Sequence, residues 1–128
     1  MVQVKAEAKY LPISPRKVRL VADLIRGKSM GESLVLLENI PKKGAYFLKK
    51  LIYSASANAV NNLNLKEENL VVNQLLVDEG PRVKRMDKSH GARFNRGIIR
   101  KRTSHVKVIL EERKNANYRW QVRQRSGE

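Results

Sequence analysis

Cationic side chains crowd one internal stretch of the sequence, residues 82–107, which holds ten Lys and Arg residues and one acid, Asp87. The net charge is +7 over residues 1–64, −3 over 65–81 and +2 over 108–128, so residues 82–107 supply +9 of the total of +15. A guanidinium group can donate two parallel hydrogen bonds to a phosphate, and so large a charge excess repels itself unless a polyanion is bound. The chemistry that these residues offer is therefore the binding of nucleic-acid phosphates.

Residue patterns that are typical of enzymes are absent from the sequence. His90 and His105 lack the spacing of a zinc-binding helix, and no glycine-rich phosphate loop is present. Asp78 and Glu79 are adjacent in a strand-like segment, so their side chains point to opposite faces and cannot act as a pair. The chain also has no cysteine, which excludes thiol chemistry and suits a reducing compartment. We therefore expect no enzymatic activity, no cofactor and no bound metal.

An anionic membrane surface is the second class of polyanionic partner. No apolar run approaches the roughly 18 residues that a membrane-spanning helix needs. The first seven residues, MVQVKAE, have no cationic segment followed by an apolar stretch, so they do not resemble a secretory signal. We expect a cytoplasmic protein with no membrane partner.

Two elements precede residue 28. Apolar and polar residues alternate over residues 2–9, which predicts a half-buried strand. Ser14 and Pro15 are typical of a helix start, and the apolar residues that follow share one helical face. Those residues are Val18, Val21, Ala22 and Ile25. Gly27 is the expected C-cap of this helix.

The spacing of Ser29 and Glu32 predicts a second helix, which Pro41 must end. A longer helix is expected over residues 44–62. Strands are expected over Leu70–Glu79 and Ser104–Glu111. Strict alternation would place Leu70, Val72 and Leu76 on one face of the first strand and Val71, Leu75 and Val77 on the other. In the second strand it places Val106, Val108 and Leu110 together.

The basic stretch between these two strands, residues 80–103, is too long for an ordinary hairpin loop. We expect a two-stranded extension that turns near residues 89–92 and reaches on the order of 30 Å, at about 3.3 Å per residue. A lone ribbon of this kind is marginal in water, so we expect RNA to order it. A charge run is more often a solvated face or a disordered tail. Here its place between two strands, and the presence of Phe94, Asn95, Thr103 and Ser104, favour an RNA surface.

The last residues, from Arg113 on, are polar and basic. Tyr118 and Trp120 lie among arginines there, and either can stack on unpaired bases or pin the tail to the body. We expect one domain over residues 1–112, with a hairpin at 80–107, and a basic extension over 113–128.

Four stretches match a known family in order and approximate spacing: SPRKVRLVADLIRG, SASANAVNN, VDEGP and RKRTSH. With these motifs, which lie within residues 4–111, the chain resembles the bacterial type of large-subunit ribosomal protein family twenty-two, the universal L-twenty-two family. The resemblance implies an α+β fold in which a small antiparallel three-stranded sheet packs on three helices and a long basic β-hairpin protrudes.

The resemblance also implies a function: binding of large-subunit (23S-type) rRNA, early subunit assembly, and a hairpin that lines the nascent-peptide exit tunnel. Its partners would be rRNA, neighbouring large-subunit proteins and the nascent polypeptide, with macrolide antibiotics bound nearby. The candidate rRNA-binding residues are Arg16, Lys17, Arg19, Arg26, Lys28, Arg82, Lys84, Arg85, Lys88, Arg96, Arg100, Lys101, Arg102, Thr103, Ser104 and His105.

The candidate exit-tunnel residues are those at the hairpin tip, Ser89, His90, Gly91, Ala92 and Arg93. Members of the family usually carry a Pro-Arg-Ala-x-Gly-Arg-Ala-like stretch there, and this chain reads MDKSHGARFNRG instead. The region is therefore expected at the tunnel, without a single residue being assigned to the wall.

Two other functions are compatible with a basic, cysteine-free chain. A ribosome-free RNA chaperone or translational regulator would be found mostly outside ribosomes. An RNA-processing enzyme would need catalytic residues, and the sequence provides no pattern for them.

Overall fold

The structure, a computed structural model, describes residues 2–89 and 96–113. Its elements are, in chain order, β1 (Gln3–Leu11), α1 (Pro15–Ile25), α2 (Met30–Asn39), α3 (Lys43–Leu63), the short 3₁₀ helix η1 (Glu67–Asn69), β2 (Leu70–Glu79), β3 (Val83–Asp87), β4 (Gly97–Lys101) and β5 (Ser104–Glu112).

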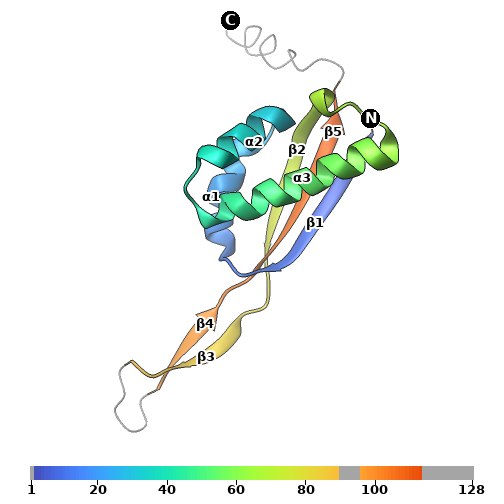
Figure 1. Ribbon diagram of the computed structural model, residues 1–128. Helices are drawn as coiled ribbons and strands as arrows, with labels where there is room; N and C mark the ends of the chain where they lie inside the picture. Colours follow the sequence, from blue (N-terminus) through green and yellow to red (C-terminus); the bar gives the residue numbers. More distant parts are fainter. Residues whose placement is uncertain (1, 90–95, 114–128) are drawn as a thin grey trace, which may run out of the picture.

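The body has two layers (Figure 1). Strands β1, β5 and β2 form an antiparallel sheet in that order, and the three α-helices cover one of its faces. Strands β3 and β4 pair with each other and protrude from the end of the sheet as a hairpin. The predicted α+β class, with three helices on a three-stranded antiparallel sheet and a projecting hairpin, is confirmed.

Helix α1 begins as predicted, with Ser14 at the N-cap and Pro15 in the first turn, although the Ser14 side chain makes no capping hydrogen bond. The predicted apolar face is buried. The C-cap is Arg26, one residue earlier than predicted. Gly27 follows it with a φ of 72°, a left-handed conformation that glycine adopts without steric cost.

Helices α2 and α3 also follow local signals. The hydroxyl of Ser29 accepts a hydrogen bond from the backbone N–H of Glu32 (3.3 Å), which caps α2. Helix α3 ends at Leu63, and the residue after it, Asn64, is a left-handed C-cap with a φ of 52°. Among residues 2–89 and 96–113, no helix is both long and apolar enough to cross a lipid bilayer.

Strand β2 departs from the predicted alternation. A register shift between Val72 and Gln74 inserts one extra residue opposite β5. A bulge of this kind moves the residues after it to the other face of the sheet. Leu75 therefore joins Val72 in the core, whereas Leu76, which we expected beside Val72, is 45% exposed. The predicted division of β2 into two faces was wrong for this reason.

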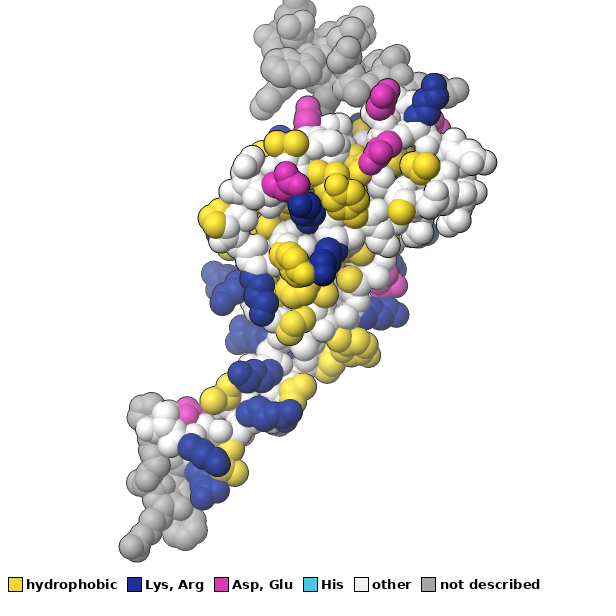
Figure 2. Space-filling view, in the orientation of Figure 1, with side chains coloured by type: hydrophobic (Ala, Val, Ile, Leu, Met, Phe, Trp, Pro, Cys, Tyr) yellow, Lys and Arg dark blue, Asp and Glu magenta, His cyan; other side chains and the backbone are white. Residues whose placement is uncertain are grey.

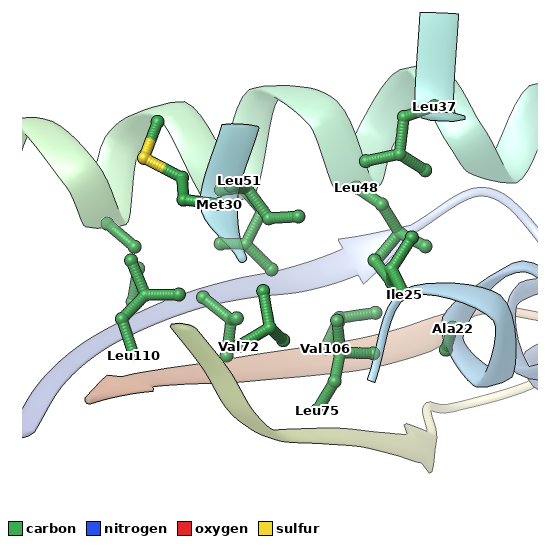
Figure 3. Packing of buried hydrophobic residues seen from close by; sticks show 14 of the residues in the cluster. Ala22, Ile25, Met30, Leu37, Leu48, Leu51, Val72, Leu75, Val106 and Leu110 are labelled. Carbon is green, nitrogen blue, oxygen red and sulfur yellow. The ribbon is translucent and has the colours of Figure 1, made fainter. Parts of the chain in front are cut away.

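The core lies between the helices and the sheet. Ile25 of α1 and Leu48 of α3 are fully buried against Val72 and Val106 of the sheet (Figure 3). The predicted inward face of β5 is confirmed, because Val106, Val108 and Leu110 are all fully buried.

The hairpin joins the body at a root that three residues form. The backbone N–H of Gly80 donates to the carbonyl of Thr103 (2.9 Å), and the hydroxyl of Thr103 donates to the carbonyl of Pro81 (2.8 Å). Residues 104–107, which we included both in the hairpin at 80–107 and in the strand Ser104–Glu111, belong to β5, where all four pair with β2 and all but His105 pair with β1. The part that protrudes therefore starts and ends at this root.

The root has no room for a side chain at position 80. A Cβ there would lie 2.3 Å from Oγ1 and 3.2 Å from the carbonyl carbon of Thr103. We predict that Gly80→Ala lowers the free energy of unfolding by about 1–3 kcal/mol, because the two arms must separate to accept the methyl group. Chemical denaturation measures this change.

Gly31 provides the matched control, since nothing lies within 4 Å of a Cβ built on it. Gly31→Ala should leave stability unchanged or raise it by up to about 1 kcal/mol, because alanine favours helix. Equal effects of the two substitutions would contradict the tight root.

Candidate nucleic-acid interface

The arms of the hairpin expose their charges to solvent. Every residue of β3 and β4 is exposed except Asp87, which is half-buried. Figure 2 shows Lys and Arg side chains along the hairpin and on the adjoining end of the body. The predicted rRNA-binding residues of the arms thus share one continuous protrusion.

Cross-strand pairing brings like charges together. Lys84 lies directly opposite Arg100, an arrangement that destabilises a ribbon in isolation. Within the described part of the chain, several cations of the hairpin and α1 have no ion pair. These are Arg16, Lys17, Lys84, Lys88, Arg100, Lys101 and Arg102. An external polyanion would both relieve the repulsion and supply the missing partners.

Apolar side chains accompany the cations on both faces of the hairpin. Met86 lies opposite Ile98 on one face, and Ile99 lies opposite Arg85 on the other. These apolar side chains are 41–57% exposed, with no core beneath them. A ribbon that carries both kinds of side chain on each face is suited to burial in a crevice of folded RNA, where it meets phosphates as well as sugars and base edges.

Asp87 is the one acid of residues 82–107. Its carboxylate accepts hydrogen bonds from the hydroxyl (2.5 Å) and the backbone N–H (2.9 Å) of Ser89. These two bonds lower the pKa of Asp87, because they stabilise its charged form. Of the predicted exit-tunnel residues, Ser89 is described by the structure, and His90, Gly91, Ala92 and Arg93 lie outside the described residues.

Two of the predicted RNA-binding arginines of the first helix region contact the protein itself. Arg19 donates from Nε (3.2 Å) and Nη2 (2.9 Å) to the carbonyl of Val77. Arg26 donates from Nε (3.1 Å) and Nη2 (2.8 Å) to the carbonyl of Leu75, and it forms an ion pair with Asp23. Arg16 and Lys17 have no such partner in the described chain and are exposed to solvent.

These contacts cover the outer edge of β2. The backbone N–H of Gly27 donates to the carbonyl of Val72 (2.7 Å), and the N–H of Val72 donates to the carbonyl of Lys28 (2.9 Å). The guanidinium groups of Arg19 and Arg26 continue this row at Val77 and Leu75. An open strand edge invites pairing with other chains, so these arginines protect the edge and fix α1 on the sheet.

The end of the return arm also differs from the prediction. Ser104 is fully buried, so it presents no surface to an external partner in this structure, and its contact with RNA stays a prediction. The hydroxyl proton of Thr103 is used at the root. His105 accepts the backbone N–H of Tyr10 on Nδ1 (3.0 Å), and the two rings meet edge to face, with centroids 4.8 Å apart.

Sequence reasoning missed Tyr10 and the outer surface of α3. On α3, Lys49 forms an ion pair with Glu38 (2.7 Å), which raises the pKa of Lys49, and Lys50 lies 4.4 Å from the ring centre of Tyr46. The sequence did contain a pattern that indicates this surface of α3, because lysines and tyrosines recur at helical spacing between the apolar residues of the helix. No residue pattern indicated the conformation of Tyr10.

Comparisons with known proteins give one family. The family model described as "Ribosomal protein L22p/L17e" matches residues 6–111. A "Large ribosomal subunit protein uL22" from Thermus thermophilus is 53% identical over 111 residues, covering 87% of this chain and 96% of the relative. Proteins of the same name from Halothermothrix orenii and Pelotomaculum thermopropionicum are 46% and 43% identical, and each match covers 88% of this chain and 97% of the relative.

We expect the two groups of cations at α1 to differ when they are replaced, one affecting stability and the other RNA binding. We predict that Arg19→Gln and Arg26→Gln each lower the free energy of unfolding by about 1–2 kcal/mol, because each leaves a β2 carbonyl without its charged donor. Arg16→Gln and Lys17→Gln should stay within about 0.5 kcal/mol of the parent chain and weaken RNA binding instead. Urea denaturation and filter binding to rRNA, measured on the same four variants, provide the check. Equal stability of all four variants would contradict the structural role of Arg19 and Arg26.

Proposed function

The chain belongs to the ribosomal protein L22p/L17e family, and on this premise we propose that it is a structural component of the large ribosomal subunit that binds large-subunit rRNA. The family resemblance inferred from four sequence motifs is confirmed. The proposal places the chain in the cytoplasm, within the ribosome, beside other large-subunit proteins.

One observation carries this proposal. The described cations of the hairpin arms are exposed, lie close to one another and, apart from Arg82 with Glu79, lack acidic partners. Phosphate groups provide the opposite charge, and their neutralisation releases condensed counterions, which drives association. Because the cations lie on both faces of a ribbon, the RNA that they bind should surround the hairpin on more than one side.

The body and the hairpin would have different tasks in this role. The core holds α1 and the sheet rigidly, so Arg16 and Lys17 and the hairpin root keep a fixed relation. The arms, which bury little of their own surface, would gain their order from rRNA. A protein of this kind can join distant RNA segments early in assembly, because the cations of α1 and the hairpin root are held in a fixed relation before RNA is bound.

Sucrose-gradient fractionation with immunodetection of this chain tests the proposal. We expect the chain in the large-subunit and ribosome fractions at one copy per particle, retained in a high-salt wash. A pool found mostly at the top of the gradient would favour the alternative function, a ribosome-free RNA chaperone or translational regulator.

The finer part of the proposal places the hairpin tip at the wall of the nascent-peptide exit tunnel, close to where macrolide antibiotics bind. Its support is the family resemblance and the exposed hairpin, whose paired arms end at Asp87 and Gly97. We predict that a photo-crosslinking side chain introduced at positions 89–93 forms crosslinks with a stalled nascent chain in ribosomes.

A crosslinker at Tyr53, an exposed residue of α3, is the matched control and should give none. Crosslinks from α3 and none from the tip would contradict the tunnel assignment while leaving rRNA binding intact.

A further inference from the structure

Tyr10 has an unusual backbone conformation for its residue type. The register between β1 and β5 shifts between Ala8 and Leu11, so two residues of β1, Lys9 and Tyr10, stand opposite His105. Within this bulge Tyr10 has a φ of 55°, in the left-handed region that favours glycine. For a bulky residue that conformation costs about 1–2 kcal/mol, and such strain commonly marks a functional position.

The strained backbone presents the aromatic ring to solvent. Tyr10 is 64% exposed, and His105 contacts it in two ways, since its Nδ1 accepts the backbone N–H of Tyr10 and its ring meets the tyrosine ring edge to face. Bulges often re-aim a side chain in this way. Neither solubility nor strand pairing would require a tyrosine with a left-handed backbone at this position.

The contact with Tyr10 also determines which nitrogen of His105 carries its proton. Because a backbone N–H donates to Nδ1, this nitrogen is the acceptor, and in the neutral ring the proton lies on Nε2. The half-exposed His105 therefore keeps one donor for an external group. Asp78 lies directly opposite His105 on β2, on the same face of the sheet, and adds an acceptor.

We propose that Tyr10 and His105 form a stacking site for an unpaired base of the bound RNA, at the root of the hairpin. The inference rests on the proposed rRNA binding and adds a base contact to it. An aromatic ring offers the stacking surface, and the Nε2–H of His105 and the carboxylate of Asp78 offer a donor and an acceptor for a base edge. Asp78 disfavours a phosphate at this point, whereas a base carries no charge.

The position of the site supports RNA as its ligand. His105 follows the return arm directly, with Arg102 three residues before it and Lys107 two residues after it on the same face. RNA that neutralises the arms would therefore pass the Tyr10 ring as it reaches the body.

The substitution Tyr10→Gly gives a sharp test because glycine adopts a φ of 55° without strain. It removes the ring and leaves the backbone N–H that donates to His105. We expect the variant to fold with about the same stability, since relief of strain offsets the removal of the ring. Its affinity for deproteinised large-subunit rRNA should fall about 5- to 100-fold, the loss typical of one stacked base. Its affinity for a perfectly paired RNA duplex should not change, because a duplex offers no unpaired base.

Two further variants complete the experiment. Tyr10→Phe should bind rRNA like the parent chain, since stacking does not need the hydroxyl group. Tyr53→Ala, which removes another exposed tyrosine, on α3, should also retain binding. If thermal unfolding shows that the glycine variant is not folded, Tyr10→Asn replaces it, because asparagine tolerates the left-handed region.

Several results would overturn the stacking site. Unchanged rRNA affinity of Tyr10→Gly would do so, and so would an equal loss on rRNA and on the duplex. Normal rRNA affinity with poor incorporation of the variant into large subunits would assign Tyr10 to a protein contact instead. In each of these cases rRNA binding by the parent chain leaves the proposed function intact, whereas failure of the parent chain to bind rRNA would refute that function itself.

Discussion

The structure depends on one electrostatic constraint, which is that a ribbon with like charges opposite one another and no core beneath it must be stabilised from outside. Lys84 and Arg100 face each other across the hairpin, and the neighbouring apolar residues Met86 and Ile98 stay half exposed. Neither burial nor ion pairing within the described chain offsets this repulsion. A bound polyanion would supply the opposite charge that the hairpin lacks.

The body of the protein fixes the position of the hairpin root. Its small core joins three helices to the sheet, and Gly80 and Thr103 bring the two arms together where they leave β2 and β5. Arg19 and Arg26 contribute from α1 by covering the free carbonyls of β2. Arginine thus has two roles in this chain, since Arg19 and Arg26 donate to backbone carbonyls of β2, whereas Arg16 and Arg100 are exposed and have no ion pair within the described chain.

The sequence predicted the elements well because their signals are local. The helix start at Ser14, the helix end before Pro41 and the alternation of Val106, Val108 and Leu110 each depend on a few neighbouring residues. The faces of β2 could not be predicted, because one inserted residue near Gln74 reverses the alternation and leaves no trace in composition.

The candidate site was predictable as a region and less so residue by residue. Charge density located the hairpin, but it cannot distinguish Arg16, which is exposed to solvent, from Arg19, whose partner is a backbone carbonyl 58 residues away. Burial of Ser104 and the left-handed backbone of Tyr10 are likewise consequences of how β1 and β5 pair, which only the folded chain reveals.

The central claim, that RNA phosphates neutralise the excess charge of this chain, is tested most directly by the salt dependence of its affinity for large-subunit rRNA. If on the order of eight phosphates are neutralised, the slope of log K against log salt concentration should be about −5 to −7. Replacing Lys84, Arg100 and Lys101 by glutamine should make the slope shallower by about one unit for each phosphate that the variant no longer neutralises. A slope near zero for the parent chain, or one that these substitutions leave unchanged, would contradict the account.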